Sequence, residues 1–179
     1  KQLSSFRAHP GPHWLTSLDF SSSGGMLVTG SHEGKVKLWN PQTGDQLSEL
    51  QHSDWIEDAA FSPDDRFLAV ALHVTGTWIW DVARKQVVAR LPAHDLNMSG
   101  VAFSPDGRLL ATASAKHNSP NAPRSKNPDG FAEVKLWELE YDDSLPVPPT
   151  APTAGPVTEE EDVAAAGSLW ILKGHKASI

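Results

Sequence analysis

The chain repeats one order of features about every 40 residues, and this periodicity limits its possible folds more than any other property. Phe20, Phe61 and Phe103 are separated by 41 and 42 residues, and each ends an alternating apolar run that follows a histidine. A turn, a second apolar run and a tryptophan come after each phenylalanine. Trp39 and Trp80 each lie 19 residues after their phenylalanine, whereas Trp137 is delayed. A period of this length accommodates roughly four strands, so we expect a repeated four-stranded unit.

Alternation and turn residues predict where the strands of each unit lie. The first strands are Leu15–Phe20, Ile56–Phe61 and Met98–Phe103. The second strands are Met26–Ser31, Phe67–Leu72 and Leu109–Ser114. The third strands are Lys35–Trp39, Thr77–Trp80 and Glu133–Trp137. The fourth strands are Gln46–Leu50 and Gln86–Leu91, with Gln2–Phe6 and Ser168–Leu172 in the corresponding place before His9 and His175.

Composition agrees with an all-β fold. The chain has 14 prolines and 13 glycines, which fall between short apolar runs and indicate turns. It has no cysteine, which excludes a disulfide framework and is compatible with a reducing compartment, so we expect an intracellular location, cytoplasmic or nuclear. No apolar run approaches the length of a membrane span and no signal peptide is visible, so we expect no membrane partner.

The net charge of -7 comes from one segment rather than from the whole chain. Between Glu140 and Asp162 lie seven acidic residues and no lysine or arginine. The rest of the chain is therefore close to neutral. General affinity for nucleic acid depends on neutralising phosphates with basic residues, so we expect no nucleic-acid partner.

These features resemble the WD-repeat family of β-propellers: a histidine opening each unit, Ser-Pro-Asp-Gly at 104–107, a second strand of small residues, and a Trp-acid type of ending. The resemblance covers repeats of about 9–50, 52–91 and 94–172, and a fourth that begins at 174. It implies four-stranded blades around a central channel. Propellers close with about four to eight blades, whereas this chain supplies about three. We therefore expect a segment of a longer protein of about seven blades, whose remaining blades are its nearest partners; assembly from several chains is the alternative.

The resemblance also implies a hydrogen-bonded set in each blade that joins the histidine, a serine of the second strand, an acid of the next turn and the tryptophan. The residues expected in these sets are His9, Ser31 and Trp39, then His52 and Trp80, then His94, Ser114 and Trp137. Glu33 stands at the acid position of the first repeat. The second repeat has Leu72 and Val74 instead, so its set should be incomplete, and the third acid position falls within an insertion. Because these histidines recur once per repeat, we expect a structural role and no metal site.

No catalytic pattern is present. The chain has no G-x-S-x-G elbow, no phosphate-binding loop, no H-E-x-x-H and no cysteine nucleophile. Its carboxylates cluster only in the acidic segment, where burial is not expected to tune a pKa. We therefore expect neither an enzyme nor a cofactor.

Binding residues are expected where the first strands begin, because loops of the propeller face meet there. The candidates are Trp14, Trp55 and Asn97, with His32, His73, Asp54 and Asp95 nearby. Exposed tryptophans are effective anchors because they bury a large area with little loss of entropy. The alternative is that Trp14 and Trp55 pack between neighbouring blades.

Two insertions interrupt the third repeat. Residues 115–130 form a basic loop on the same face, in which Lys116, Arg124 and Lys126 would suit an acidic partner. A tolerated surface loop is the alternative. Residues 140–167 are acidic and rich in proline, and their composition predicts disorder on the opposite face.

The sequence predicts a non-catalytic scaffold that displays partner-binding loops on a rigid propeller face. The alternative is a propeller domain of a larger enzyme or ligand-sensing protein whose activity lies outside this segment.

Overall fold

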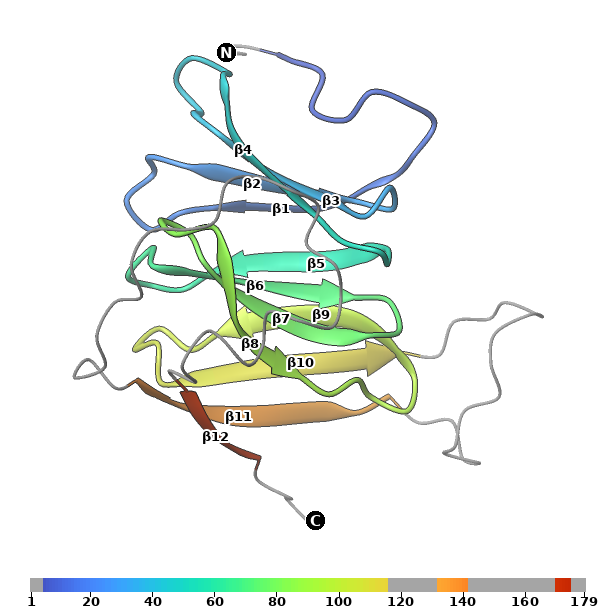
Figure 1. Cartoon of the computed structure of the whole chain (residues 1–179), viewed down its shortest axis with the longest axis vertical. Coiled ribbons are helices and arrows are strands. Elements are labelled where there is room, and N and C mark those ends of the chain that lie inside the picture. The colour runs from blue at the N-terminus through green and yellow to red at the C-terminus, as the bar shows by residue number, and fades with distance from the viewer. Residues whose placement is uncertain (1–4, 116–131, 142–169, 175–179) are drawn as a thin grey trace.

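The computed structural model describes residues 5–115, 132–141 and 170–174, and within these residues it consists of strands, turns and loops. Three four-stranded sheets lie one above another along the long axis (Figure 1). Blade 1 contains β1 (Leu15–Phe20), β2 (Leu27–Ser31), β3 (Lys35–Trp39) and β4 (Gln46–Gln51). Blade 2 contains β5 (Ile56–Phe61), β6 (Phe67–Leu72), β7 (Gly76–Asp81) and β8 (Gln86–Leu91). Blade 3 contains β9 (Asn97–Phe103), β10 (Leu109–Ala115), β11 (Val134–Tyr141) and β12 (Trp170–Gly174).

Each sheet is an antiparallel meander, as expected for a propeller blade. Neighbours in the sheet are neighbours in the sequence, in the orders β1-β2-β3-β4, β5-β6-β7-β8 and β9-β10-β11-β12. Apart from Gln2–Phe6, the expected strands are confirmed to within a few residues of their bounds. The alternating patterns predict them well because each strand presents one side chain in two to a neighbouring sheet.

One expected strand and one expected boundary are wrong. Ser5 and Phe6, the described part of the expected strand Gln2–Phe6, are not in a strand. Within the described residues no sheet precedes blade 1, and Phe6 instead lies against Trp39, with ring centroids 5.0 Å apart. The expected acidic insertion begins too early at residue 140, because β11 continues to Tyr141 and pairs there with β12. The rest of that insertion, 142–167, lies outside the described residues, as does His175.

The turn between the first and second strands of blades 2 and 3 is built the same way. The backbone N–H groups of Phe67 and Leu109 donate to the hydroxyls of Ser62 and Ser104, each at 2.9 Å. Gly107 has φ +72°, and Asp65 takes the same position in blade 2 with φ +60°. This left-handed geometry suits glycine, so the backbone conformation of Asp65 is less favourable than that of Gly107. Its carboxylate compensates by accepting the amides of Ser22 and Ser23 in blade 1.

The core lies between the blades, in two layers. The layer between blades 1 and 2 includes Val28, Val36, Leu38, Leu50, Ile56, Phe61, Leu68, Val70, Leu72, Trp78 and Trp80. The layer between blades 2 and 3 includes Phe67, Ala69, Ala71, Ile79, Leu91, Met98, Val101, Leu110, Trp137 and Leu139. Blade 2 therefore contributes alternate residues of β6 and β7 to opposite layers, and both strands are buried along their whole length.

Polar contacts also cross between the blades. Asp58 of β5 accepts the hydroxyl of Ser17 in blade 1 (3.0 Å) and the backbone N–H of Val101 in blade 3 (3.0 Å). Asp19 of β1 accepts the backbone N–H of Phe61 in blade 2 at 2.9 Å. The inner strands are thus joined by carboxylates that satisfy amides of the neighbouring blade.

The two outer blades leave apolar side chains exposed on their far sides. These residues are Leu18 and Phe20 on β1, and Val134 and Leu136 on β11. In a strand, alternate residues face opposite sides, so these positions face away from blade 2. Among the described residues there is no helix with the length and apolar character needed to cross a membrane.

Candidate protein-docking face

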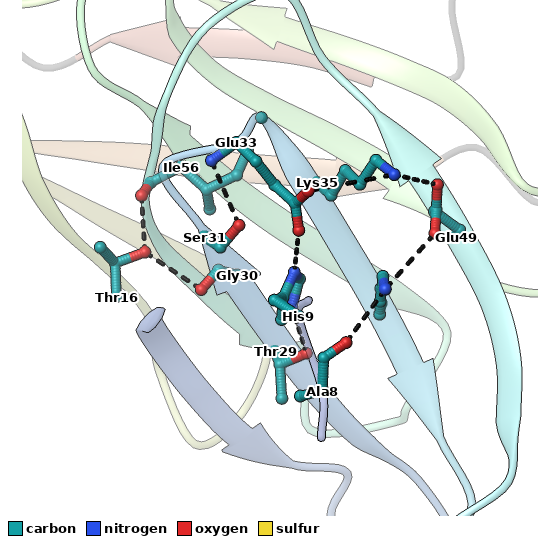
Figure 2. A network of polar contacts seen from close by, with 12 residues as sticks. Ala8, His9, Thr16, Thr29, Gly30, Ser31, Glu33, Lys35, Glu49 and Ile56 are labelled. Atoms are coloured by element: carbon teal, nitrogen blue, oxygen red, sulfur yellow. Dashed lines mark hydrogen bonds and ion pairs between the residues drawn. The ribbon is translucent and has the colours of Figure 1, made fainter. Parts of the chain in front are cut away.

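Blade 1 contains a chain of hydrogen bonds that ties its opening histidine to the sheet (Figure 2). The Nδ1–H of His9 donates to Glu33 at 2.6 Å, and the Nε2 of His9 lies 2.8 Å from the hydroxyl of Thr29. The indole N–H of Trp39 donates to the same hydroxyl at 2.9 Å. The hydroxyl therefore accepts from the indole and donates to the imidazole, which fixes His9 as the Nδ1–H tautomer.

Blade 3 repeats this arrangement with corresponding residues. His94 lies 3.0 Å from a carboxylate oxygen of Glu133 and 2.8 Å from the hydroxyl of Thr112, which also accepts the indole N–H of Trp137 at 2.9 Å. Glu133 follows the insertion, so the expectation that the acid would fall inside the insertion is wrong. The acid position is filled by Glu133, the residue directly before β11.

The expected serines do not join these sets. The hydroxyl of Ser31 accepts the backbone N–H of Glu33 at 3.2 Å, and the hydroxyl of Ser114 bonds to the backbone of Glu133. The bridging residues are instead Thr29 and Thr112, two positions earlier on the second strand. Side chains two residues apart share a face, so the sequence pattern alone did not separate the two positions.

Blade 2 has a reduced set. Val70 takes the place of the threonine, and the indole N–H of Trp80 donates directly to Nε2 of His52 at 3.1 Å. The other ring nitrogen of His52, Nδ1, is buried and has no hydrogen-bond partner within the described residues. Burial lowers the pKa of His52 to about 4, against weaker opposing contributions from the backbone of Gly34 and the charge of Asp54.

Burial and the contacts within the two complete sets shift the pKa values of Glu33 and His94. Burial raises the pKa of Glu33. Its hydrogen bond to His9 and the charges of His9 and Lys35 lower this pKa by more, so it lies below its ordinary value. Burial and the charge of Lys135 hold the pKa of His94 below its ordinary value, although Glu133 acts in the opposite direction. The sets are therefore hydrogen-bonded supports for the opening histidines, consistent with a structural role.

These sets anchor the segments that lead into the first strands, where Trp14, Trp55 and Asn97 lie. Backbone pairing then fixes the neighbours: the N–H of His32 donates to the carbonyl of Trp14 at 3.1 Å, and that of His73 to Trp55 at 2.9 Å. In blade 3, Asn97 pairs with Ala115 at the corresponding place. Tryptophan and histidine are thus set side by side in blades 1 and 2.

The four rings form a continuous row across blades 1 and 2. The centroids of Trp14 and His32 are 5.6 Å apart, those of His32 and Trp55 are 4.9 Å apart and stacked, and those of Trp55 and His73 are 5.1 Å apart. Trp14 is 73% exposed and Trp55 is 49% exposed. They do not pack in either core layer. We call Trp14, His32, Trp55 and His73 the aromatic row.

Glu57 lies beside this row and was not among the residues expected from the sequence. Its carboxylate accepts a hydrogen bond from His73 Nδ1 at 2.6 Å and lies 3.7 Å from His32 Nε2. Nothing in the alternating pattern of 56–61 distinguishes it from an ordinary exposed strand residue. Only the spatial meeting of His32 and His73 marks the position.

The remaining expected binding residues have different surroundings. Asp54 accepts the backbone N–H groups of Val74 and Thr75, so its carboxylate is used within the chain and shapes the loop after β6. Asp95 is exposed, and Asn97 is partly buried at the start of β9. Lys116, Arg124 and Lys126 lie outside the described residues. Across the ranges that the structure covers, no three histidine or acidic side chains are grouped to hold a metal ion.

Comparison with known proteins gives consistent relatives. The family model described as WD domain, G-beta repeat matches residues 1–40, 44–81 and 85–118. Protein HIR1 of Yarrowia lipolytica is 29% identical over 133 residues, which is 64% of this chain and 12% of that protein. In Drosophila melanogaster, the small ribosomal subunit protein RACK1 is 31% identical over 55% of this chain and 30% of its own length. The Protein LST8 homolog of the same organism is 34% identical over 49% of this chain and 31% of its own.

A solved structure supports the fold alone. The computationally designed Ika4 protein superposes with a TM-score of 0.58 at 22% identity, over 77% of this chain and 72% of that one. The curated relatives are much longer than the matched region, so the chain spans less than a third of each relative described above.

Proposed function

Because this chain belongs to the WD-repeat family of β-propeller proteins, we propose that it is a non-catalytic scaffold that binds other proteins on the face carrying the aromatic row. The observation that carries the proposal is the exposure of Trp14 and Trp55 on a rigid support. Large aromatic side chains that remain outside a core are typical anchors of protein interfaces. The name of one relative, small ribosomal subunit protein RACK1, assigns that protein to an assembly, which agrees with the proposal.

The support under these anchors suits rigid display. His9 and His52 hold the segments before β1 and β5 against the sheet, and the backbone bonds of His32 and His73 fix the ends of β2 and β6. Anchors that are already ordered lose little conformational entropy on binding. The face therefore requires little rearrangement to receive a partner.

We also propose that the exposed apolar flanks are covered by further blades of a longer chain. Leu18, Phe20, Val134 and Leu136 face away from blade 2, as the core residues of an inter-blade layer would. A contiguous apolar face left in water is a site for association. This covering is independent of the docking face, because the anchors do not belong to those flanks.

The test compares proteins captured by the chain and by two variants. Trp14→Ala with Trp55→Ala removes both anchors, while Leu47→Ala with Leu109→Ala removes exposed apolar area elsewhere as a matched control. We expect the anchor variant to capture roughly tenfold less, or lower still, of each specific partner, because hot-spot truncations cost about 2 kcal/mol of binding free energy. Quantitative mass spectrometry of the captured proteins gives the measurement, with circular dichroism as the check of folding. Equal capture by the anchor variant would contradict the proposal.

A further inference from the structure

Glu57 occupies a bulge at the start of β5. The pairing of β5 with β6 shifts register between Ile56 and Asp58, so Glu57 is the extra residue. A bulge turns the side chain away from the direction that regular alternation gives it. This explains how a residue of the inner strand reaches two histidines that belong to different blades.

The other two blades carry neutral residues at the same position. β1 has a register shift between Leu15 and Ser17, with Thr16 as the extra residue, and its hydroxyl donates to the carbonyl of Ile56 at 2.6 Å. In β9 the register passes from Gly100 to Met98, leaving Ser99 unpaired. Blade 2 alone, of these three, places a carboxylate there.

Among the described residues, the carboxylate of Glu57 has imidazole partners alone. Its described contacts are with His73 Nδ1 at 2.6 Å and His32 Nε2 at 3.7 Å, and its side chain is 20% exposed. Within the described residues, no lysine or arginine lies within ion-pair distance of it. The Nε2 atom of His32 is buried and has no hydrogen-bond partner there. A partly desolvated carboxylate without a strong cationic partner favours a cation supplied from outside.

The rings around Glu57 favour the same kind of ligand. The exposed indoles of Trp14 and Trp55 lie at two places along the aromatic row, and His32 lies between them, stacked on Trp55 and tilted against Trp14. Indole faces attract cations, most strongly when water is partly excluded. The guanidinium group of arginine is planar, so it can stack on an aromatic ring while it donates two hydrogen bonds to a carboxylate.

Other ligand classes fit less well. An aliphatic side chain would further desolvate Glu57 without replacing its lost water contacts. An acidic or phosphorylated segment would place like charges beside Glu57 and Asp54. Lysine would supply a charge but is more strongly hydrated and does not stack in a plane.

We propose that Glu57 and the exposed rings of the aromatic row bind an arginine side chain of a partner protein. This assignment rests on the proposed docking function and names the chemistry of its partner. Glu57 pairs with the guanidinium group, and Trp14 and Trp55 contact its face and the neighbouring residues of the bound segment.

The test is an NMR titration of the ¹⁵N-labelled chain with the peptide acetyl-Ala-Arg-Ala-amide. The indole N–H signals of Trp14 and Trp55, assigned from single Trp→Phe variants, are expected to move on titration, while those of the buried Trp39 and Trp80 stay in place. The same peptide with citrulline has nearly the same shape but no charge, and we expect roughly tenfold weaker binding. A lysine peptide is expected to bind several-fold more weakly than the arginine peptide.

Two glutamate variants complete the experiment. Glu57→Gln is expected to weaken arginine-peptide binding by roughly tenfold. Glu49→Gln removes the same charge at a residue already paired with Lys35 and Lys37, and should leave binding unchanged. If Glu57→Gln disturbs the fold, the comparison of arginine with citrulline on the unaltered chain still decides the question.

Equal binding of the citrulline or lysine peptide would overturn the assignment, and so would full binding by a folded Glu57→Gln variant. The docking function can fail separately. If the Trp14→Ala, Trp55→Ala variant loses its captured proteins but the titration shows no arginine binding, the scaffold proposal stands and the arginine assignment falls. If the titration succeeds but capture is unchanged, the arginine site exists without serving as the docking face.

Discussion

Blade 2 and the two blades beside it fix the same tryptophan in different ways. In blades 1 and 3 a threonine hydroxyl connects the indole to the histidine, and a glutamate holds the far side of the ring. In blade 2 the indole of Trp80 donates directly to His52, and Nδ1 of that ring has no hydrogen-bond partner among the residues that the structure describes. Val70 fills the place of the hydroxyl.

The difference follows from the surroundings of each sheet. β6 and β7 are buried along their whole length because apolar layers cover both faces of blade 2. Trp78 and Trp80 lie in one of those layers, and Arg90 lies 4.1 Å from the ring centroid of Trp78. Within the described residues, blades 1 and 3 each pack against one neighbouring blade, and the outer face of blade 1 is covered by the segment that carries Phe6 and His9. Apolar packing can therefore replace part of the polar set where blades lie on both sides, and the hydrogen-bonded set is complete where only one blade packs.

Lowering the pH tests the weak point of blade 2 and has the largest expected effect. His52 has a pKa of about 4 in the folded chain, against 6.5 ordinarily, because burial disfavours the charged ring. Between those values the unfolded chain binds more protons, so this contribution to stability is complete above about pH 6.5 and decreases as the pH falls towards 4. The loss in unfolding free energy is on the order of 3 kcal/mol across that window.

Urea unfolding at pH 7.0 and at intervals down to pH 4.5, followed by tryptophan fluorescence, measures this loss. Proton NMR of the histidine rings assigns it, because His52 should remain neutral until the pH is close to 4. His94 contributes in the same direction, since its pKa is also lowered. A His52 ring that titrates near 6.5 would show that blade 2 is not stabilised by burial in the way described.

Removing the bridging hydroxyl of an outer blade should have the next largest effect. Thr29→Val or Thr112→Val leaves an indole N–H and an imidazole nitrogen without their shared partner in a buried site. We expect a loss of about 2 kcal/mol for each, because an unsatisfied buried polar group costs about 1–3 kcal/mol. Thr43→Val, in an exposed turn, is the matched control, and chemical denaturation gives the measurement. A loss under about 0.5 kcal/mol would mean that the outer blades tolerate the arrangement of blade 2.

Completing the set of blade 2 should have the smallest effect. Val74 stands at the position of Glu33 and is exposed, so Val74→Glu places a carboxylate near the unpartnered Nδ1 of His52. A nearby carboxylate raises a histidine pKa, and we expect about 1 kcal/mol of added stability and a weaker dependence on pH. Val74→Gln separates charge from length. An unchanged His52 pKa in the glutamate variant would contradict this expectation.

The sequence predicted the blades well because alternation, turns and the repeat all report the same arrangement. It did not identify Thr29, although the register explains the choice. Trp39 lies opposite Leu27, so Thr29 is its diagonal neighbour on the same face, whereas Ser31 is two residues farther away. Tracing the strand pairing back from the tryptophan, rather than from the turn, would have selected the threonine.

The contacts of the aromatic row could be predicted only in part. Trp14 and Trp55 stand out as large residues at the start of a strand, and their spacing places them in neighbouring blades. Glu57 could not be recognised, because a bulge changes the direction of a side chain without leaving a mark in the alternation. Asp54 was expected to face a partner, yet its position next to the loop after β6 engages it with backbone amides.

The carboxylate of Asp58 has a consequence for how such a chain can evolve. It receives one hydrogen bond from Ser17 of the preceding blade and another from Val101 of the following blade. The donor in the following blade is a backbone N–H, which every residue except proline supplies, so this contact survives a change of the neighbouring repeat. The contact with the preceding blade depends on a hydroxyl side chain. A rearranged repeat order therefore keeps both hydrogen bonds of Asp58 only where the preceding repeat has a hydroxyl residue at the position of Ser17.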